Sequence, residues 1–186
     1  MSTRLTSLAV LAACGLSACV FVHATDSSAG DSKHAHGSGS GQRASARIEA
    51  RSGSSLSGTA TFSEQKGGVL VEVSVTNAPP GWHAVHVHEK GDCSAADGSS
   101  AGSHFNPAGH KHGSPHASEH HAGDLGNMWV DEKGSGHHVL LMPALAVADG
   151  PNSVRGRSII VHAAADDLVT DPTGNAGGRI GCGVIR

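Results

Sequence analysis

Aromatic residues are scarce in this chain. Its 186 residues contain no tyrosine, three phenylalanines and two tryptophans, and aromatics make up only 3% of the composition. A core dominated by aromatic rings is therefore excluded, and Val, Ile, Leu and Ala must supply the buried apolar surface. The sequence also shows no aromatic platform and no basic stripe, which argues against a nucleic acid as the partner.

Positive charge is in short supply as well. The formal net charge is −3, and it becomes −4 once Arg4 is lost with the leader described below. A small anionic substrate is still compatible with this balance, because the local field in a cleft can oppose the net charge of the protein.

Long hydrophobic runs are also missing. The apolar stretch from Leu5 to Leu16 follows the positive Arg4 and is too short to span a bilayer, a pattern typical of a cleaved export signal. Leu16-Ser17-Ala18-Cys19 then fits the motif at which bacterial lipoproteins are cut before a cysteine that becomes lipidated. We therefore predict a signal over residues 1–19, with a lipid on Cys19 and the mature protein outside the cytoplasm.

Two alternatives to this cleavage site stay open. Leu11-Ala12-Ala13-Cys14 fits the same lipoprotein motif but leaves a shorter apolar stretch before it. Val22-His23-Ala24 is an ordinary cleavage site, which would release the protein freely. All of these alternatives place the mature chain in the periplasm or cell envelope.

Cysteine is rare in the remainder of the chain, where only Cys93 and Cys182 are found. In an exported protein, an isolated pair of this kind predicts one disulfide bond. Two buried thiols are the alternative.

The chain divides into a polar tether and one domain. Residues 20–43 are rich in Ser, Gly, Ala and Asp without a hydrophobic period, which predicts a flexible tether. From residue 44 to 186, short alternating or apolar segments separated by Gly, Ser and Pro predict β-strands. The predicted strands cover residues 46–51, 57–64, 69–76, 82–89, 125–131, 138–142, 158–162 and 180–185. This pattern predicts an all-β antiparallel sandwich or barrel.

Two long segments interrupt the strands. Residues 90–123 and 163–179 have neither a helical nor a strand period, and loops of this length in a compact domain are usually functional. The first one carries most of a dense histidine stretch, His104 to Asp124, with six of the 15 histidines of the chain. These loops therefore predict a site built outside a rigid barrel.

The histidines form a pattern that suits metal ions. In a strand over residues 82–89, His86 and His88 share one face about 7 Å apart, while Val85 and Val87 share the other. His162 ends a later strand, and the first loop supplies the remaining candidates, His104, His112, His121 and Asp124. Three histidines with one aspartate suit zinc, and four histidines suit copper.

At this point the chain resembles the copper/zinc superoxide dismutases that bacteria export. Six stretches carry the resemblance, which covers about residues 45–186: Val85-His86-Val87-His88-Glu89-Lys90-Gly91-Asp92-Cys93, Gly102-Ser103-His104-Phe105-Asn106-Pro107, Lys111-His112-Gly113, His121-Ala122-Gly123-Asp124-Leu125-Gly126-Asn127, Ile160-Val161-His162 and Gly174-Asn175-Ala176-Gly177-Gly178-Arg179-Ile180-Gly181-Cys182-Gly183-Val184-Ile185.

The resemblance implies an eight-stranded antiparallel Greek-key β-barrel and the dismutation of superoxide by copper, with zinc in a structural role. It implies copper ligands His86, His88, His104 and His162, and zinc ligands His104, His112, His121 and Asp124, so that His104 bridges both metals. Arg179 corresponds to the arginine that attracts and orients the anion, and the Cys93–Cys182 pair to the disulfide.

Some assignments stay open at this stage. Asp166 corresponds to the aspartate that hydrogen-bonds one copper histidine and one zinc histidine, with Asp167 as the alternative. His110, His116 and His120 do not fall at ligand positions, and we expect them to be solvated. The family includes dimers and monomers, so a homodimer is one alternative. A metal store without catalysis is one rival to an enzyme, although storage needs no anion guide such as Arg179. A metallochaperone is another, although such domains commonly lack copper ligands and none is missing here.

Overall fold

The computed structural model describes residues 41–186, so the predicted signal, Cys19 and nearly all of the predicted tether lie outside the described residues. Eight strands make up the described part: β1 (Arg43–Ala50), β2 (Ser57–Gln65), β3 (Gly68–Thr76), β4 (Gly81–His88), β5 (Asp124–Val130), β6 (Gly136–Met142), β7 (Ser158–His162) and β8 (Arg179–Val184). All eight predicted strands are present, with ends that differ by up to three residues. β1 begins at Arg43, the last residue of the range assigned to the tether.

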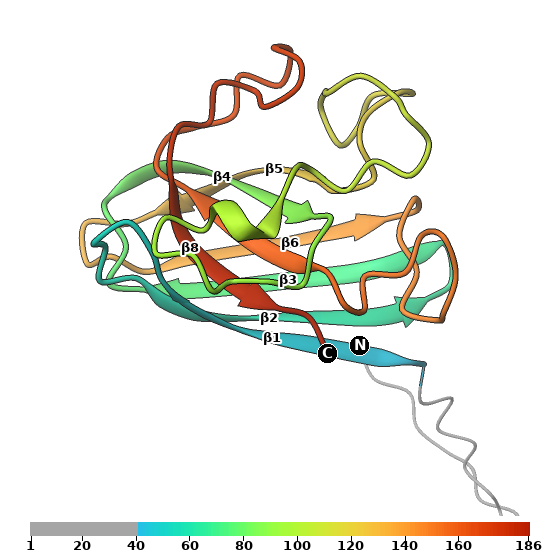
Figure 1. The fold of residues 1–186 in the computed structure, drawn as a ribbon, viewed down its shortest axis with the longest axis horizontal. Helices are drawn as coiled ribbons and strands as arrows, with labels where there is room; N and C mark the ends of the chain where they lie inside the picture. Colours follow the sequence, from blue (N-terminus) through green and yellow to red (C-terminus); the bar gives the residue numbers. More distant parts are fainter. Residues whose placement is uncertain (1–40) are drawn as a thin grey trace, which may run out of the picture. The chain divides into compact units, whose positions relative to one another are not determined.

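The strands close into an antiparallel barrel in the order β1-β2-β3-β6-β5-β4-β7-β8. The β3–β6 and β4–β7 neighbours are far apart in sequence, which is the Greek-key crossing that the resemblance implied. Figure 1 shows the second long loop and the later part of the first above one side of the barrel, and β1 on the opposite side, while the start of the first loop runs beside β8. One 3-10 turn over Ser99–Ala101, in the first loop, was not predicted. Among the described residues, no helix has the length and apolar character of a membrane span.

Strand alternation fills the barrel with branched aliphatic side chains. In β3, Val69, Val71, Val73 and Val75 are all buried, while the intervening residues are more exposed. Phe62 is one of only two aromatic residues in the main core, which confirms that Val, Ile, Leu and Ala supply most of it. The low aromatic content is therefore compatible with a well-packed barrel, because alternate inward side chains interdigitate there.

Strand β4 breaks the usual pattern of one buried and one exposed face. Its last six residues are all buried. Val85 and Val87 belong to the barrel core, whereas His86 and His88 lie on the outer face beneath the loops. The outer face of β4 is therefore where the loops meet the barrel.

The first long loop is pinned onto β4 at both of its histidine-bearing ends. The Phe105 amide donates to Val87 O, the Val87 amide donates to Gly123 O, and the Gly123 amide donates to Phe105 O, at 2.8, 2.9 and 2.9 Å. A Cβ at Gly123 would collide with the Val87 carbonyl oxygen, so only glycine allows this approach. These contacts fix His104 and Asp124 beside β4.

A disulfide joins Cys93 in this loop to Cys182 in β8, as predicted from the isolated pair of cysteines. Arg51 reinforces the junction, because its Nε and Nη2 atoms donate to Cys93 O at 3.1 and 2.6 Å. The start of the first loop is thereby tied to β8, the strand that begins at Arg179.

We expect the metal-free Cys93→Ser/Cys182→Ser protein to lose up to about 4 kcal/mol in the free energy of unfolding, because the bond closes a loop of 89 residues. Denaturant titration followed by far-UV circular dichroism measures this loss. Reduced wild-type protein is the control and should behave like the double variant. Equal unfolding midpoints for oxidised wild type and the variant would contradict the expectation.

Candidate metal centre

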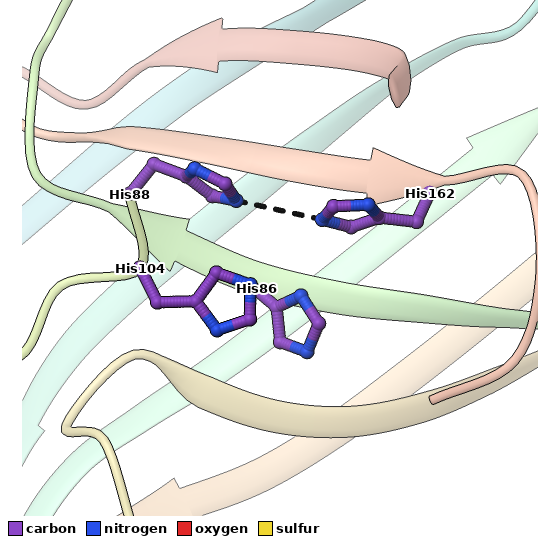
Figure 2. Close-up of side chains that lie close together, drawn as sticks. All are labelled: His86, His88, His104 and His162. Carbon is purple, nitrogen blue, oxygen red and sulfur yellow. Dashed lines mark hydrogen bonds between the residues drawn. The ribbon is translucent and has the colours of Figure 1, made fainter. Parts of the chain in front are cut away.

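Four buried histidines converge on the outer face of the barrel. His86 and His88 come from β4, His162 from the end of β7 and His104 from the first loop, and one donor nitrogen from each lies within 4.8 Å of the others. The Nε2 atoms of His88 and His162 are 3.4 Å apart, and the His86 and His104 rings are 4.0 Å apart between centroids (Figure 2). We call this set the four-histidine group.

Each of these four rings has one nitrogen held by another group. His88 Nδ1 donates to Gly102 O at 2.9 Å, and His162 Nδ1 donates to Gly177 O at 3.3 Å. A carbonyl oxygen only accepts, so in the neutral rings both Nε2 atoms carry lone pairs. The 3.4 Å contact in Figure 2 then brings two lone pairs together, an arrangement that a cation stabilises and a hydrogen bond does not.

The other two rings leave a buried nitrogen without any partner. His86 Nε2 contacts Asp166 and His104 Nδ1 contacts Asp124, while His86 Nδ1 and His104 Nε2 have no hydrogen-bond partner. An unsatisfied buried polar atom costs about 1–3 kcal/mol, and proteins rarely leave one unexplained. The group thus offers four nitrogen donors that lack a protein partner of suitable chemistry, and it fits a metal ion that prefers imidazole.

Burial keeps His86, His88 and His162 neutral. It lowers the pKa of His86 to about 4, although the hydrogen bond to Asp166 opposes the shift. It also lowers the pKa values of His88 and His162 well below the usual range. At neutral pH all three rings therefore keep a lone pair free for a metal.

A second group shares His104. Asp124 Oδ1 lies 3.0 Å from His104 Nδ1, 3.0 Å from His112 Nδ1 and 3.3 Å from His121 Nδ1. The Nδ1 atoms of His121 and His104 are 3.4 Å apart. Ligands about 2 Å from a tetrahedral zinc are separated by about 3.3 Å, so these spacings are those of a zinc site. We call this set the His3Asp group.

His86 also lies near the His3Asp group. The donor atoms that lie within 4.8 Å of one another there belong to His86, His104, His112 and Asp124, without His121. We nevertheless place His121 in the group, because its Nδ1 approaches both Asp124 and His104 closely, whereas His86 Nε2 is engaged by Asp166.

In the His3Asp group, hydrogen bonds outweigh burial in setting the direction of the pKa shifts. Burial lowers the pKa of His112, but contacts with Asp124 and Asp166 outweigh it and raise the value to about 10. Burial raises the pKa of Asp124, but hydrogen bonds from His104, His112 and His121 hold it well below its usual range. The group therefore combines a firmly ionised carboxylate with a basic imidazole.

Asp166 connects the two groups. Its Oδ2 lies 2.8 Å from His86 Nε2, its Oδ1 lies 2.8 Å from His112 Nε2, and the side chain is buried. Asn127 of β5 holds the backbone here, donating from Nδ2 to Asp166 O at 2.9 Å and accepting from the Asp166 amide at 2.7 Å. Asp167, the alternative assignment, instead points to Thr170 and Asn175 on the surface.

Arg179 stands at a cavity of about 640 Å³ that opens onto the four-histidine group. The cavity is lined by His88, Glu89, Ser103, His104, Asn106, His121, His162, Pro172, Thr173, Asn175, Gly177 and Arg179. The guanidinium donates from Nη1 to Gly98 O and from Nη2 to Gly102 O, both at 2.7 Å. Gly98 and Gly102 lie in the part of the first loop that follows Cys93, which we call the disulfide loop. Their carbonyls therefore fix this positive charge at the cavity wall.

Several histidines lie outside both groups. His110 and His116 are exposed, and His110 Nδ1 lies 3.3 Å from His120 O. His120 Nδ1 lies 2.6 Å from His121 O. His83 is buried behind the four-histidine group, with its ring nitrogens 2.7 Å from His162 O and 2.8 Å from Pro79 O.

Asn127 and the Gly102 carbonyl were not predicted to belong to the site. Asn127 lies in one of the stretches that carry the family resemblance, but its contacts with the Asp166 backbone form only when the second loop folds over β5. The Gly102 carbonyl has no sequence signal at all.

Comparisons with known proteins agree with this geometry. Residues 56–185 match the family model for copper/zinc superoxide dismutase (SODC). Superoxide dismutase [Cu-Zn] 2 of Aquifex aeolicus (strain VF5) is 40% identical over 134 residues, which cover 69% of this chain and 78% of that protein. A crystal structure of the clock protein EA4 is similar with a TM-score of 0.70 and 39% identity, covering 81% of this chain and 97% of the other.

In the metal-free protein, we expect NMR titration to show His112 losing its proton only near pH 10 and His86 gaining one only near pH 4. The His86 value lies below that of an unfolded histidine, so its contribution to stability is present above pH 6.5 and lost as pH falls toward 4. The His112 contribution is present below pH 6.5 and lost as pH rises through about 10.

Asp124→Asn is the control for this titration, because it removes the carboxylate that raises the pKa of His112 and should bring that value down. Titration of both histidines near pH 6.5 in the wild-type protein would contradict the electrostatic account of the two groups.

Proposed function

Because the chain belongs to the copper/zinc superoxide dismutase family, we propose which of its residues carry the reaction. The chain is an oxidoreductase, a superoxide dismutase that converts two superoxide ions and two protons into oxygen and hydrogen peroxide with copper and zinc as cofactors. When bound, copper supplies the one-electron chemistry, and zinc supplies a fixed charge without redox activity.

We assign copper to the four-histidine group, through His86 Nδ1 and the Nε2 atoms of His88, His104 and His162. The observation that carries this proposal is the pair of buried nitrogens without partners, His86 Nδ1 and His104 Nε2. Imidazole nitrogens, which both oxidation states of copper tolerate, suit this metal. We assign zinc to the His3Asp group, whose spacings support a closed tetrahedral site.

His104 belongs to both groups, with Nδ1 toward Asp124 and Nε2 toward the four-histidine group. We propose that His104 Nε2, when it is not bound to copper, would take up the proton that is delivered to the departing peroxide. Its place in the wall of the cavity supports this role, because a proton there needs no further carrier to reach the product.

We propose that Arg179 attracts superoxide and orients it toward the four-histidine group. Its guanidinium is a permanent cation with a planar fork of donors, and two carbonyls hold it at the cavity wall. A non-catalytic metal store, the rival interpretation, gives no reason for a fixed cation at this position.

Asp166 is proposed as a positioning residue that acts through His86 and His112. By accepting from both Nε2 atoms it directs their Nδ1 atoms toward different metals, and it couples the two sites mechanically. Loss of such a partner typically weakens metal binding about 10–100-fold.

Single substitutions should separate the two metals. We expect His162→Ala to abolish copper binding while zinc is retained, and His121→Ala to weaken zinc binding first. Asp166→Ala should weaken both metals about 10–100-fold, since it leaves His86 and His112 without their acceptor. Metal content by mass spectrometry and competition with chelators measure these effects.

His110→Ala is the matched control, because His110 lies in the same loop but outside both groups. It should leave the affinities for copper and zinc unchanged. Loss of only one metal in Asp166→Ala would contradict the coupling role of this carboxylate.

Arg179→Gln should lower the rate of superoxide consumption by at least about tenfold, with copper and zinc contents unchanged, because the local attraction for the anion is lost. Arg179→Lys should restore part of the rate and of its dependence on ionic strength, since it keeps the charge without the planar fork. A full rate in fully metallated Arg179→Gln would refute the proposed role.

We propose that the protein is exported to the bacterial cell envelope and anchored through a lipid on Cys19. The export-signal pattern of residues 1–19 supports this proposal. Mass spectrometry of the mature N-terminus tests it, because a diacylated Cys19 and a free N-terminus after Ala24 differ in mass.

For a homodimer, we propose contact through Trp82 of β4 and Trp129 of β5. Both are about half exposed, and their rings pack edge to face at 5.2 Å between centroids. An exposed pair of large apolar rings is unusual on a monomer and fits a second apolar surface. Sedimentation of wild type and of Trp82→Lys tests whether a dimer forms and uses this contact.

A further inference from the structure

One face of the barrel gathers arginines that the proposed reaction does not use. Arg43 and Arg47 lie in β1, where exposed residues alternate with buried ones, and Arg51 follows the strand at the same spacing of four residues. The chain end returns to the same place, because Arg186 and Ser45 exchange two backbone hydrogen bonds of 2.9 Å.

A fifth arginine joins this face from the loop before β7. The Arg155 guanidinium donates to Arg43 O. We call Arg43, Arg47, Arg51, Arg155 and Arg186 the basic face. The sequence shows no basic stripe because these arginines are far apart along the chain. Barrel closure and the return of the chain end bring them onto one face.

The basic face differs sharply in charge from the rest of the described part. Residues 41–186 contain 11 Lys and Arg and 14 Asp and Glu. Five of these cations lie on the basic face, with Glu49 near Arg51 and Glu64 near Arg155, whereas the rest of the described part holds six cations and 12 acids. The domain is therefore strongly polarised in charge, although its net charge is negative.

Three of these arginines are free to bind. Arg43, Arg47 and Arg186 are exposed, and among residues 41–186 their guanidinium groups form no side-chain hydrogen bond or ion pair. Arg51 is different, since it bonds to Cys93 O and lies 3.8 Å from Glu49. Across the β1–β2 ladder, Ser63 and Thr59 stand opposite Arg43 and Arg47, so the surroundings are polar and not apolar.

We propose that the basic face docks on an anionic phospholipid surface. Arg43 and Arg47 are about 13 Å apart along an extended strand, and Arg186 lies beside them. Such a spread of charges on an open sheet face matches a plane of phosphate groups and not one small anion. Each arginine close to an anionic membrane contributes about fivefold in affinity.

The position of the basic face supports this partner. The described chain begins beside β1, so a membrane anchor upstream would enter at this face (Figure 1). In Figure 1 the later part of the first loop and the second loop lie across the barrel from β1, whereas the start of the first loop reaches Arg51 through Cys93 O. Docking through β1 therefore leaves the loop segments that carry His104, His121 and Asn175 of the cavity lining uncovered.

The test uses exported, metal-loaded protein that carries Cys19→Ser and so cannot be lipidated, with co-sedimentation on vesicles as the measurement. We expect binding to vesicles that contain phosphatidylglycerol, weak binding to pure phosphatidylcholine vesicles, and release by salt. Arg43→Gln/Arg47→Gln should lower the affinity for phosphatidylglycerol vesicles on the order of twentyfold.

Lys111→Gln/Lys133→Gln is the matched control, because it removes the same charge from exposed positions outside the basic face and should change the affinity much less. Superoxide consumption by both double variants verifies that they are folded. Equal loss of binding in the two variants, or equal binding to both vesicle types, would overturn the proposal. So would binding of duplex DNA by the basic face without binding of the vesicles.

Discussion

The alternation of side chains along β4 is the constraint on which the rest of the site depends. The strand sends Val85 and Val87 into the barrel core, and this packing fixes its rotation about its own axis. His86 and His88 must then point outward, where a solvated position would give two mobile imidazoles. They are instead buried, because the loops cover this one stretch of outer barrel surface.

The covering loops are held by backbone contacts that also position functional atoms. The Gly102 carbonyl accepts from His88 Nδ1 and from Arg179 Nη2, so one oxygen sets the orientation of a proposed copper ligand and of the proposed anion guide. The disulfide ties the same loop to β8, in which Arg179 is the first residue. Displacement of the disulfide loop should therefore shift the position of Arg179 more than that of the barrel strands.

Much of this arrangement follows from the sequence, and the reasons for the exceptions are physical. Strand alternation and turn residues predicted all eight strands, and the spacing of histidines within β4 placed His86 and His88 on one face. Periodicity could not show which of Asp166 and Asp167 faces the histidines, because both lie in an irregular loop. The family resemblance ranked Asp166 first, and the contacts with His86 and His112 favour that order.

Two features could not be predicted from local sequence patterns. The 3-10 turn at Ser99–Ala101 is three residues long, which is too short to give a period. The basic face requires Arg186 to return beside Ser45, a contact between the two ends of the domain. No local pattern encodes such a contact, so the sequence appeared to lack a basic stripe.

The opposite pKa shifts in the two groups indicate how metals and fold depend on each other. In the four-histidine group His86, His88 and His162 are neutral, and two buried nitrogens have no partner, so without a cation the group lowers the stability of the fold. The His3Asp group holds a buried carboxylate whose charge His112 balances as a cation. With the proposed assignment, zinc must displace that proton to bind through His112 Nδ1, whereas copper would meet His86, His88 and His162 already deprotonated. We therefore expect zinc binding to weaken more steeply than copper binding as the pH falls from 10 to 6.5, with each bound metal adding its binding free energy to the stability of the fold.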